Sequence, residues 1–185
     1  MNNSVRGPFL PNYIPFSEWP SPFLILISNQ IKLVGTVCQC GGVHLHIPGM
    51  ITVMDRIGFK IIYPLLSCYN TDKWEAIWMG ELTWSREIVS NGYNIGCLSV
   101  WWRNWDFRKK EATKKRCDEW KSFGGTDGDN YFPGQYDGGD LYPLEMIFMK
   151  TNRNIRKDDV EHLTNLYNRE KSLKFFNILT SCTVR

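Results

Sequence analysis

Hydrophobic positions follow strand-like spacing in some segments of the chain and helix-like spacing in others. Short apolar runs predict strands at residues 31–37 and 93–101. Apolar residues three and four positions apart predict helices over residues 50–59 and 72–91. Strands that alternate with helices in this way predict an α/β fold.

The expected helix ends follow from glycine and from the apolar face. The helix over residues 50–59 should end at Gly58 and the helix over residues 72–91 at Gly92, because glycine tolerates the left-handed backbone of a helix end. A last helix is predicted over residues 158–176. Its expected apolar face consists of Val160, Leu163, Leu166 and Tyr167.

The 185 residues suit one domain with a core of its own. Residues 1–22 are rich in proline and predict an extended loop, and residues 124–139 are rich in glycine and aspartate and predict another. No linker divides the chain. We expect a main region over residues 1–155 and a C-terminal helical tail over residues 156–185.

Composition is that of a soluble globular protein, since 43% of the residues are hydrophobic and 22% are charged. The net charge of +3 is too small to indicate a nucleic-acid partner by itself. No apolar run is long enough for a membrane span, and polar residues interrupt any signal segment at the start. We therefore expect no membrane span. The sequence leaves the compartment unknown, with the cytoplasm as the first expectation.

The chain contains six cysteines, which lie scattered within apolar runs. This distribution favours buried free thiols over disulfides. Cys38 and Cys40 lie near His44 and His46, but a single intervening residue is not the usual zinc spacing, and no second ligand pair follows. No metal-ligating residue is predicted.

Glu81 is the candidate catalytic residue. It follows Gly80 and comes just before an apolar helical stretch. A carboxylate at a helix N-terminus stays ionised beside the backbone N–H groups and could accept a proton from a sugar hydroxyl. On spacing alone, a helix cap is the better explanation.

Residues 80–95 resemble the acidic-residue, helix and Gly-Tyr-x-Ile pattern of inverting glycosyltransferases with the GT-A fold. In those enzymes the acidic residue lies against the acceptor and serves as the base. The resemblance therefore implies that Glu81 is the base. Many relatives carry Glu-Asp at this point, whereas Leu82 follows Glu81 here.

The segment Asn2-Asn3-Ser4-Val5-Arg6-Gly7-Pro8-Phe9 resembles the Asn-Ser-Ser-Val-Arg-Gly-Pro-Phe stretch of a glycosyltransferase-like family related to rhamnan-synthesis-F-type enzymes. It corresponds to the Asp-x-Asp motif of GT-A enzymes, so Asn2 and Ser4 take the places of metal-binding carboxylates. Amide and hydroxyl groups are weak ligands for Mg²⁺ or Mn²⁺. The resemblance thus implies either a nucleotide diphosphate bound without a tightly held metal, or its neutralisation by groups such as Arg6.

Two later stretches extend the resemblance. Residues 32–58 are similar to the family's Lys-Leu-Val-Gly-Thr, His-x-Gln-Ser-Met and Thr-Asp-Arg-x-Gly motifs, which makes His46 a candidate substrate contact, with a structural histidine as the alternative. Residues 136–153 are similar to a stretch of the family that contains His-Pro-x-Glu-x-x-Phe-x-Lys-Thr-Asn-Arg, with Tyr142 in place of the histidine. Lys150 and Arg153 match and would neutralise the departing diphosphate, with a surface basic cluster as the alternative.

The resemblance covers residues 1–155 and implies a partial GT-A-like domain with a mixed, mostly parallel sheet and flanking helices. The implied reaction transfers a hexosyl or deoxyhexosyl unit from a nucleotide sugar to a glycan hydroxyl, with Mn²⁺ or Mg²⁺ as the candidate ion at the diphosphate. In GT-A enzymes a βαβ unit precedes the Asp-x-Asp position, and this chain begins after that point. The alternative is a non-catalytic carbohydrate-binding or pseudoenzyme domain.

A further alternative comes from residues 101–116, where Trp101, Trp102 and Trp105 are interleaved with arginine and lysine. Basic residues with stacking aromatics can bind single-stranded nucleic acid. Acidic residues dilute this patch, so an exposed helix face is the simpler interpretation, and we expect no nucleic-acid partner.

Overall fold

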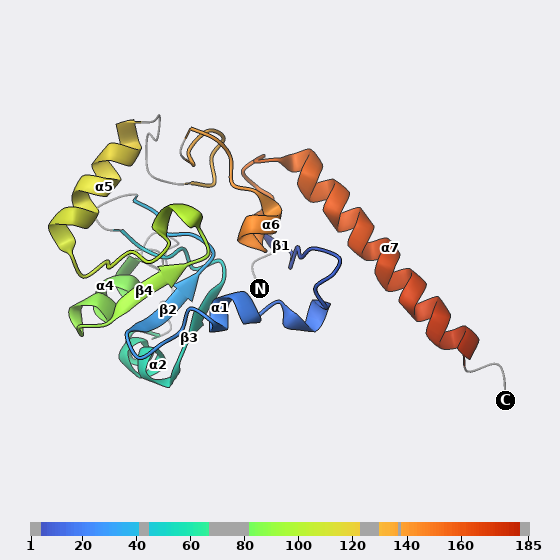
Figure 1. Cartoon of the computed structure of the whole chain (residues 1–185), viewed down its shortest axis with the longest axis horizontal. Coiled ribbons are helices and arrows are strands. Elements are labelled where there is room, and N and C mark those ends of the chain that lie inside the picture. The colour runs from blue at the N-terminus through green and yellow to red at the C-terminus, as the bar shows by residue number, and fades with distance from the viewer. Residues whose placement is uncertain (1–4, 41–44, 67–81, 123–129, 137, 182–185) are drawn as a thin grey trace.

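The computed structural model of the chain describes residues 5–40, 45–66, 82–122, 130–136 and 138–181. These residues form two small sheets with helices packed around them (Figure 1). The fold is therefore of mixed α and β structure, as the alternating apolar patterns predict.

The larger sheet has three strands in the order β3–β2–β4. These strands are β2 (Ile31–Gly35), β3 (Thr52–Met54) and β4 (Asn94–Cys97). β2 pairs in parallel with β4 but antiparallel with β3, so this small sheet is mixed, as expected, but it has one parallel and one antiparallel pairing and no parallel majority. The antiparallel pairing of β3 follows from the way the chain turns back after β2. Gln39 and His46 exchange backbone hydrogen bonds of 2.8 and 3.0 Å, and β3 consequently re-enters the sheet in the opposite direction.

Helix α2 (Arg56–Ile62) begins close to where the sequence pattern predicts that a helix ends. The helix predicted over residues 50–59 is therefore wrong for residues 50–55, because Val53 and Met54 belong to β3 and Asp55 caps the helix that follows. The Asp55 Oδ1 atom accepts a hydrogen bond of 2.8 Å from the Gly58 backbone N–H. Gly58 lies inside α2 because the helix packs closely on β2: a Cβ atom at this position would lie 2.3 Å from the Lys32 carbonyl oxygen.

Two further helices lie beside β4, namely α4 (Leu82–Ser90) and α5 (Lys110–Ser122) (Figure 1). α4 confirms the later part of the helix predicted over residues 72–91, and residues 72–81 lie outside the described part of the chain. Gly92 has a positive φ of 83° just after α4, as predicted for a glycine that ends a helix.

A second sheet joins the N-terminal segment to residues far along the chain. Strand β1 (Val5–Arg6) pairs antiparallel with β5 (Met149–Lys150), which follows helix α6 (Pro143–Met146). Gly7 allows this close contact, because a Cβ atom there would lie 2.3 Å from the Ile147 carbonyl oxygen and its φ is 130°. Within the described ranges, the remaining short helices are η1 (Phe16–Glu18), α1 (Ser21–Leu24), η2 (Tyr63–Leu65) and η4 (Val100–Trp102).

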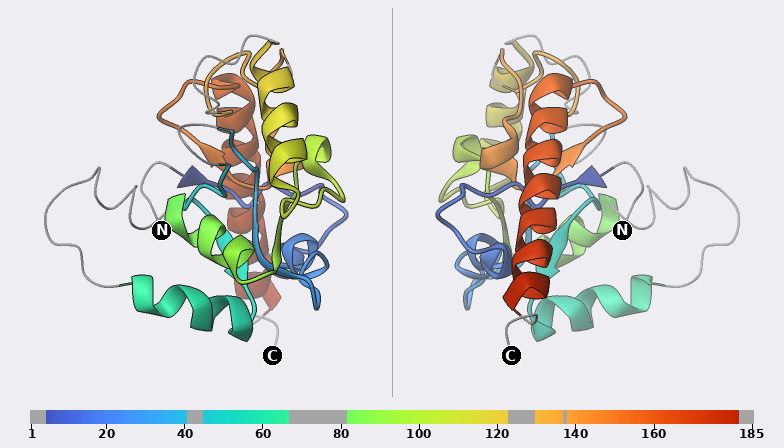
Figure 2. Two further views of the ribbon diagram at one scale, coloured as in Figure 1. Left: turned by 90° about the vertical axis from the view of Figure 1, so that its left-hand side faces the viewer. Right: turned by 90° about the vertical axis from the view of Figure 1, so that its right-hand side faces the viewer.

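The long helix α7 (Lys157–Ser181) confirms the predicted C-terminal helix and lies on the side of the molecule away from α4 and α5 (Figures 1 and 2). Val160 is 4% exposed, and the Tyr167 hydroxyl donates to the Leu10 carbonyl oxygen. Leu166 is 43% exposed, so it does not belong to the covered face that the apolar spacing predicts. Among the described residues, no helix has both the length and the apolar character needed to cross a membrane.

Alternate residues of β2 belong to two apolar clusters. Val34 joins a cluster that includes Phe23 and Phe148, while Leu33 joins a second cluster that includes Ile88 and Trp102. Successive side chains of a strand point to opposite faces, so β2 separates the two clusters.

The expectation that the cysteines are free thiols is wrong for two of them. Cys40 and Cys117, which are 77 positions apart, form a disulfide. Cys38 and Cys97 are buried free thiols, as expected. Burial raises the pKa of the Cys38 thiol well above its ordinary value, and its hydrogen bond with Cys97 raises it further. Spacing along the chain could not identify the disulfide, because the fold decides which cysteines meet.

Candidate functional site

The candidate site lies where β2 and β4 end. Ligands of open α/β sheets bind outside the carboxyl ends of parallel strands. β2 and β4 are such a pair, and their contact continues past the strands through backbone hydrogen bonds of 3.2 Å from Leu98 to Gly35 and from Ser99 to Thr36. Two polar side chains, Thr36 and Ser99, are thereby held side by side.

Two tyrosines from one later loop cover these strand ends. The Tyr131 hydroxyl lies 2.8 Å from Thr36 Oγ1, and the Tyr136 hydroxyl lies 2.8 Å from Ser99 Oγ. Tyr131 and Thr36 are almost fully buried, with exposed fractions of 0% and 1%. The loop that carries the tyrosines is thus attached to the carboxyl ends of both parallel strands.

Glu145, in the first turn of α6, completes a chain of hydrogen bonds. Its Oε1 atom accepts bonds of 2.7 Å from the Tyr136 hydroxyl and 3.2 Å from the Val100 backbone N–H. Burial raises the pKa of Tyr136 strongly, and the neighbouring Glu145 carboxylate raises it further. Tyr136 therefore stays protonated and donates to Glu145, while Ser99 donates to the Tyr136 oxygen.

Two predicted site residues, Lys150 and Arg153, lie against consecutive aromatic residues. The Lys150 ammonium lies 4.9 Å from the centre of the Tyr131 ring, and the Arg153 guanidinium carbon lies 4.8 Å from the centre of the Phe132 ring. Phe132 is 44% exposed, whereas Tyr131 is buried. These cation–π contacts hold positive charge beside the strand ends.

Arg6 does not join Lys150 on the same face of the smaller sheet. Arg6 is opposite Met149 in the register, and Val5 is opposite Lys150. Directly opposite residues of an antiparallel pair share a face, and the face alternates along each strand. Arg6 therefore lies close to Lys150 along the backbone, but its side chain lies on the other face and is exposed.

His46 is 7% exposed and lies in the backbone bridge with Gln39. The next residue, Ile47, donates its backbone N–H to Ser85 Oγ of α4 at 2.9 Å. This burial and pairing favour the structural role for His46 over a contact with substrate.

The three remaining predicted site residues, Asn2, Ser4 and Glu81, lie outside the described part of the chain. The described residues of the site instead include four that the sequence reasoning missed, which are Ser99, Tyr131, Tyr136 and Glu145. Tyr136 and Glu145 belong to the stretch that carries the resemblance, so that stretch could have identified them. Ser99 and Tyr131 carry no comparable signal.

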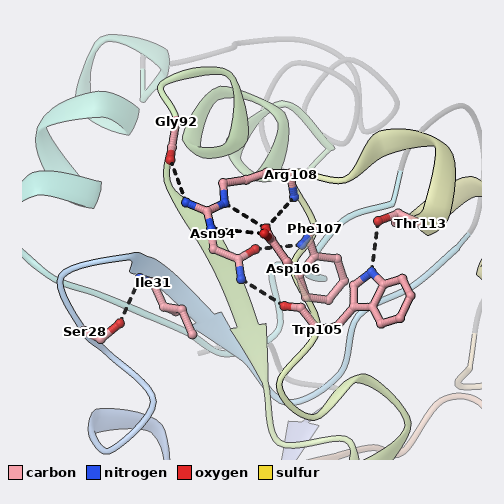
Figure 3. Close-up of polar contacts among 9 residues, drawn as sticks. All are labelled: Ser28, Ile31, Gly92, Asn94, Trp105, Asp106, Phe107, Arg108 and Thr113. Carbon is pink, nitrogen blue, oxygen red and sulfur yellow. Dashed lines mark hydrogen bonds and ion pairs between the residues drawn. The ribbon is translucent and has the colours of Figure 1, made fainter.

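The aromatic residues of the stretch over residues 101–116 pack in or against the core, whereas most of its basic residues are exposed, as the simpler interpretation expects. The Asn94 side chain donates to the Trp105 carbonyl oxygen and accepts from the Phe107 backbone N–H, each at 2.9 Å (Figure 3). Trp102 and Phe107 are only 2% and 4% exposed. Two rings of this stretch are therefore unavailable to stack on a base.

Arg116 belongs to the same packed group. Its guanidinium carbon lies 4.9, 5.3 and 4.4 Å from the ring centres of Trp101, Trp102 and Trp105. This side chain thus holds α5 against the indoles.

The part of the site that the structure describes shows no preassembled metal position. No group of three or more histidine, cysteine, aspartate or glutamate side chains in the described ranges could hold a metal ion. Lys150 and Arg153 are the described groups that could balance the charge of an anionic ligand.

Comparison with known proteins identifies no relative: no family model, no curated protein and no solved structure matches this chain.

Proposed function

We propose that this chain is a glycosyltransferase-like protein that transfers a sugar from a nucleotide-sugar donor to a glycan hydroxyl. The observation that supports this function is the position of Lys150 and Arg153 over Tyr131 and Phe132, beside the carboxyl ends of β2 and β4. The leaving nucleoside diphosphate of such a reaction develops negative charge. Fixed cations stabilise that charge.

In the proposed reaction, Glu81 accepts the proton of the acceptor hydroxyl as that oxygen attacks the anomeric carbon of the donor. The bond from the anomeric carbon to the diphosphate breaks, and the electron pair leaves on the diphosphate beside Lys150 and Arg153. Tyr136 and Glu145 orient the loop that carries the two aromatic residues, since both are hydrogen-bonded to residues that follow β4.

Binding of UDP, GDP and dTDP, measured by calorimetry and by thermal stability, tests the donor half of this proposal. Each measurement is made with Mn²⁺ and with EDTA. Lys150→Met and Arg153→Met should each weaken diphosphate binding about 10- to 150-fold, since a charge-assisted bond contributes about 1.5–3 kcal/mol. Lys157→Met is the matched control, because Lys157 is 65% exposed and pairs with Glu161 on α7.

The proposal is wrong if none of the three diphosphates binds, or if the Lys150 and Arg153 variants bind them as well as the Lys157 control does. Catalysis is tested separately, by release of nucleoside diphosphate from nucleotide sugars in the presence of oligosaccharides. Glu81→Gln should abolish release while binding of the diphosphate is retained. Binding without release from any donor would instead identify a non-catalytic carbohydrate-binding or pseudoenzyme domain.

A further inference from the structure

A pocket of about 510 Å³ opens between α4 and α5. Both helices lie on the side of the molecule away from β1 and α6 (Figure 1). This pocket is therefore separate from the candidate site that contains Lys150 and Arg153. Its volume falls within the roughly 300–1,000 Å³ of pockets that hold small molecules.

The floor of the pocket is apolar and fixed in place. Leu45, Val89, Ile95 and Phe107 line it, together with the Cys40–Cys117 disulfide. Ile95 and Phe107 are only 1% and 4% exposed. The hydrogen bond from the Phe107 backbone N–H to Asn94 Oδ1 holds the aromatic residue beside β4 (Figure 3). An apolar ligand body would therefore meet a preformed surface.

The rim of the pocket carries an excess of positive charge. Arg86 of α4 and Lys110 and Lys114 of α5 line it, against two acidic residues, Glu111 and Asp118. Lys110 and Lys114 are four positions apart and so lie on the same face of the helix. They also lie in the first turns of the 13-residue helix α5, where the helix dipole adds to the attraction of an anion.

We propose that this pocket binds a small amphipathic anion, with its apolar or aromatic body against Val89 and Phe107 and its acidic head at Lys110 and Lys114. The head can be a carboxylate, a sulfonate or a phosphate, because each presents an anionic oxygen to the two ammonium groups. This inference does not depend on the proposed transferase activity, since it uses none of the residues at Lys150.

The test compares two fluorescent probes of nearly equal shape, the anion 8-anilinonaphthalene-1-sulfonate and the uncharged N-phenyl-1-naphthylamine. Both should bind at one site per chain, and the anion should bind more tightly. The double variant Lys110→Glu with Lys114→Glu should weaken binding of the anionic probe at least about tenfold and leave binding of the neutral probe nearly unchanged. Lys115→Glu is the matched control, because Lys115 lies on α5, is 80% exposed and does not line the pocket.

A second variant tests the floor. Val89→Trp should fill the pocket and abolish binding of both probes, and Ser90→Trp at the pocket edge replaces it if thermal unfolding shows that Val89→Trp does not fold. Retention of both probes by the folded tryptophan variant would overturn the assigned location. Equal losses of anionic-probe binding in the Lys110/Lys114 and Lys115 variants would overturn the inference that Lys110 and Lys114 bind the acidic head. Unchanged UDP binding in all these variants would keep this test distinct from that of the transferase.

Discussion

Lys32 is a buried cation on strand β2, with an exposed fraction of 3%. Its ammonium group donates a hydrogen bond of 2.8 Å to Asp55 Oδ2 and one of 2.9 Å to the Ser28 carbonyl oxygen. The ammonium nitrogen also lies 5.4 Å from the centre of the Tyr93 ring. Burial by itself raises the pKa of Asp55, but hydrogen bonds from Gly58 and Lys32 outweigh it, so the pKa lies below its ordinary value. The motif residues Lys32, Asp55 and Gly58 therefore have a structural role.

Asp55→Asn should lower the free energy of unfolding by about 2–3 kcal/mol, because Asn still caps α2 but leaves the Lys32 ammonium without its carboxylate. Lys32→Met should cost less, since the buried cation is removed and Asp55, at 26% exposure, still reaches water. Urea unfolding of both variants at pH 7 measures the difference. Equal losses of unfolding free energy in the two variants would contradict the interpretation that Lys32 needs the Asp55 carboxylate more than Asp55 needs Lys32.

The same pair predicts a pH dependence. A carboxyl whose pKa is lower in the folded state stabilises the fold above the unfolded value of about 3.9, and that stabilisation is lost as the pH falls through the folded value. The difference in unfolding free energy between the natural chain and Asp55→Asn should therefore shrink between pH 7 and pH 3. A difference that stays constant over this range would contradict the pKa assignment.

At the level of elements, the apolar spacing identifies β2, β4 and α7 but misreads the segment before α2. The apolar residues between positions 50 and 59 lie three and four positions apart, which is the spacing of a helix. This spacing arises by chance, because a short strand is followed directly by the start of a helix. Asp55 was the available sign of a helix start, since an aspartate before an apolar run is a capping residue. Residues 52–54 form a strand because their backbone pairs with β2.

Gly58→Ala tests the close packing of α2 on β2. Alanine is the better helix former by about 1 kcal/mol, yet the new Cβ would collide with the Lys32 carbonyl, so a net loss of about 1–3 kcal/mol is expected. Lys60→Ala, at an exposed position of the same helix, is the control and should change stability by less than about 0.5 kcal/mol. Thermal and urea unfolding of both variants make the comparison. A Gly58→Ala variant as stable as the natural chain would show that the helix can move away.

At the level of the whole molecule, the Cys40–Cys117 disulfide joins the segment after β2 to α5 and lines the pocket between α4 and α5. Disulfides are rare in the reducing cytosol, so this pairing does not support a cytoplasmic location.

Replacement of both cysteines by serine should lower the free energy of unfolding by about 2–4 kcal/mol, because the disulfide restricts a long loop of the unfolded chain. The same variant should bind 8-anilinonaphthalene-1-sulfonate more weakly, since the wall of the pocket is no longer fixed. Digestion without reductant followed by mass spectrometry should show the Cys40 and Cys117 peptides linked. Detection of both peptides as free thiols would contradict the pairing.

The sequence by itself determined the local features of this protein: the mixed α and β class, the strands at β2 and β4, the end of α4 at Gly92, and the helix α7. Each follows from spacing or backbone preference within a few neighbouring residues. Contacts between distant residues were decided only by the tertiary structure, because packing and not spacing brings them together. These contacts include the antiparallel return to β3, the Cys40–Cys117 disulfide, and the attachment of Tyr131 and Tyr136 to the strand ends.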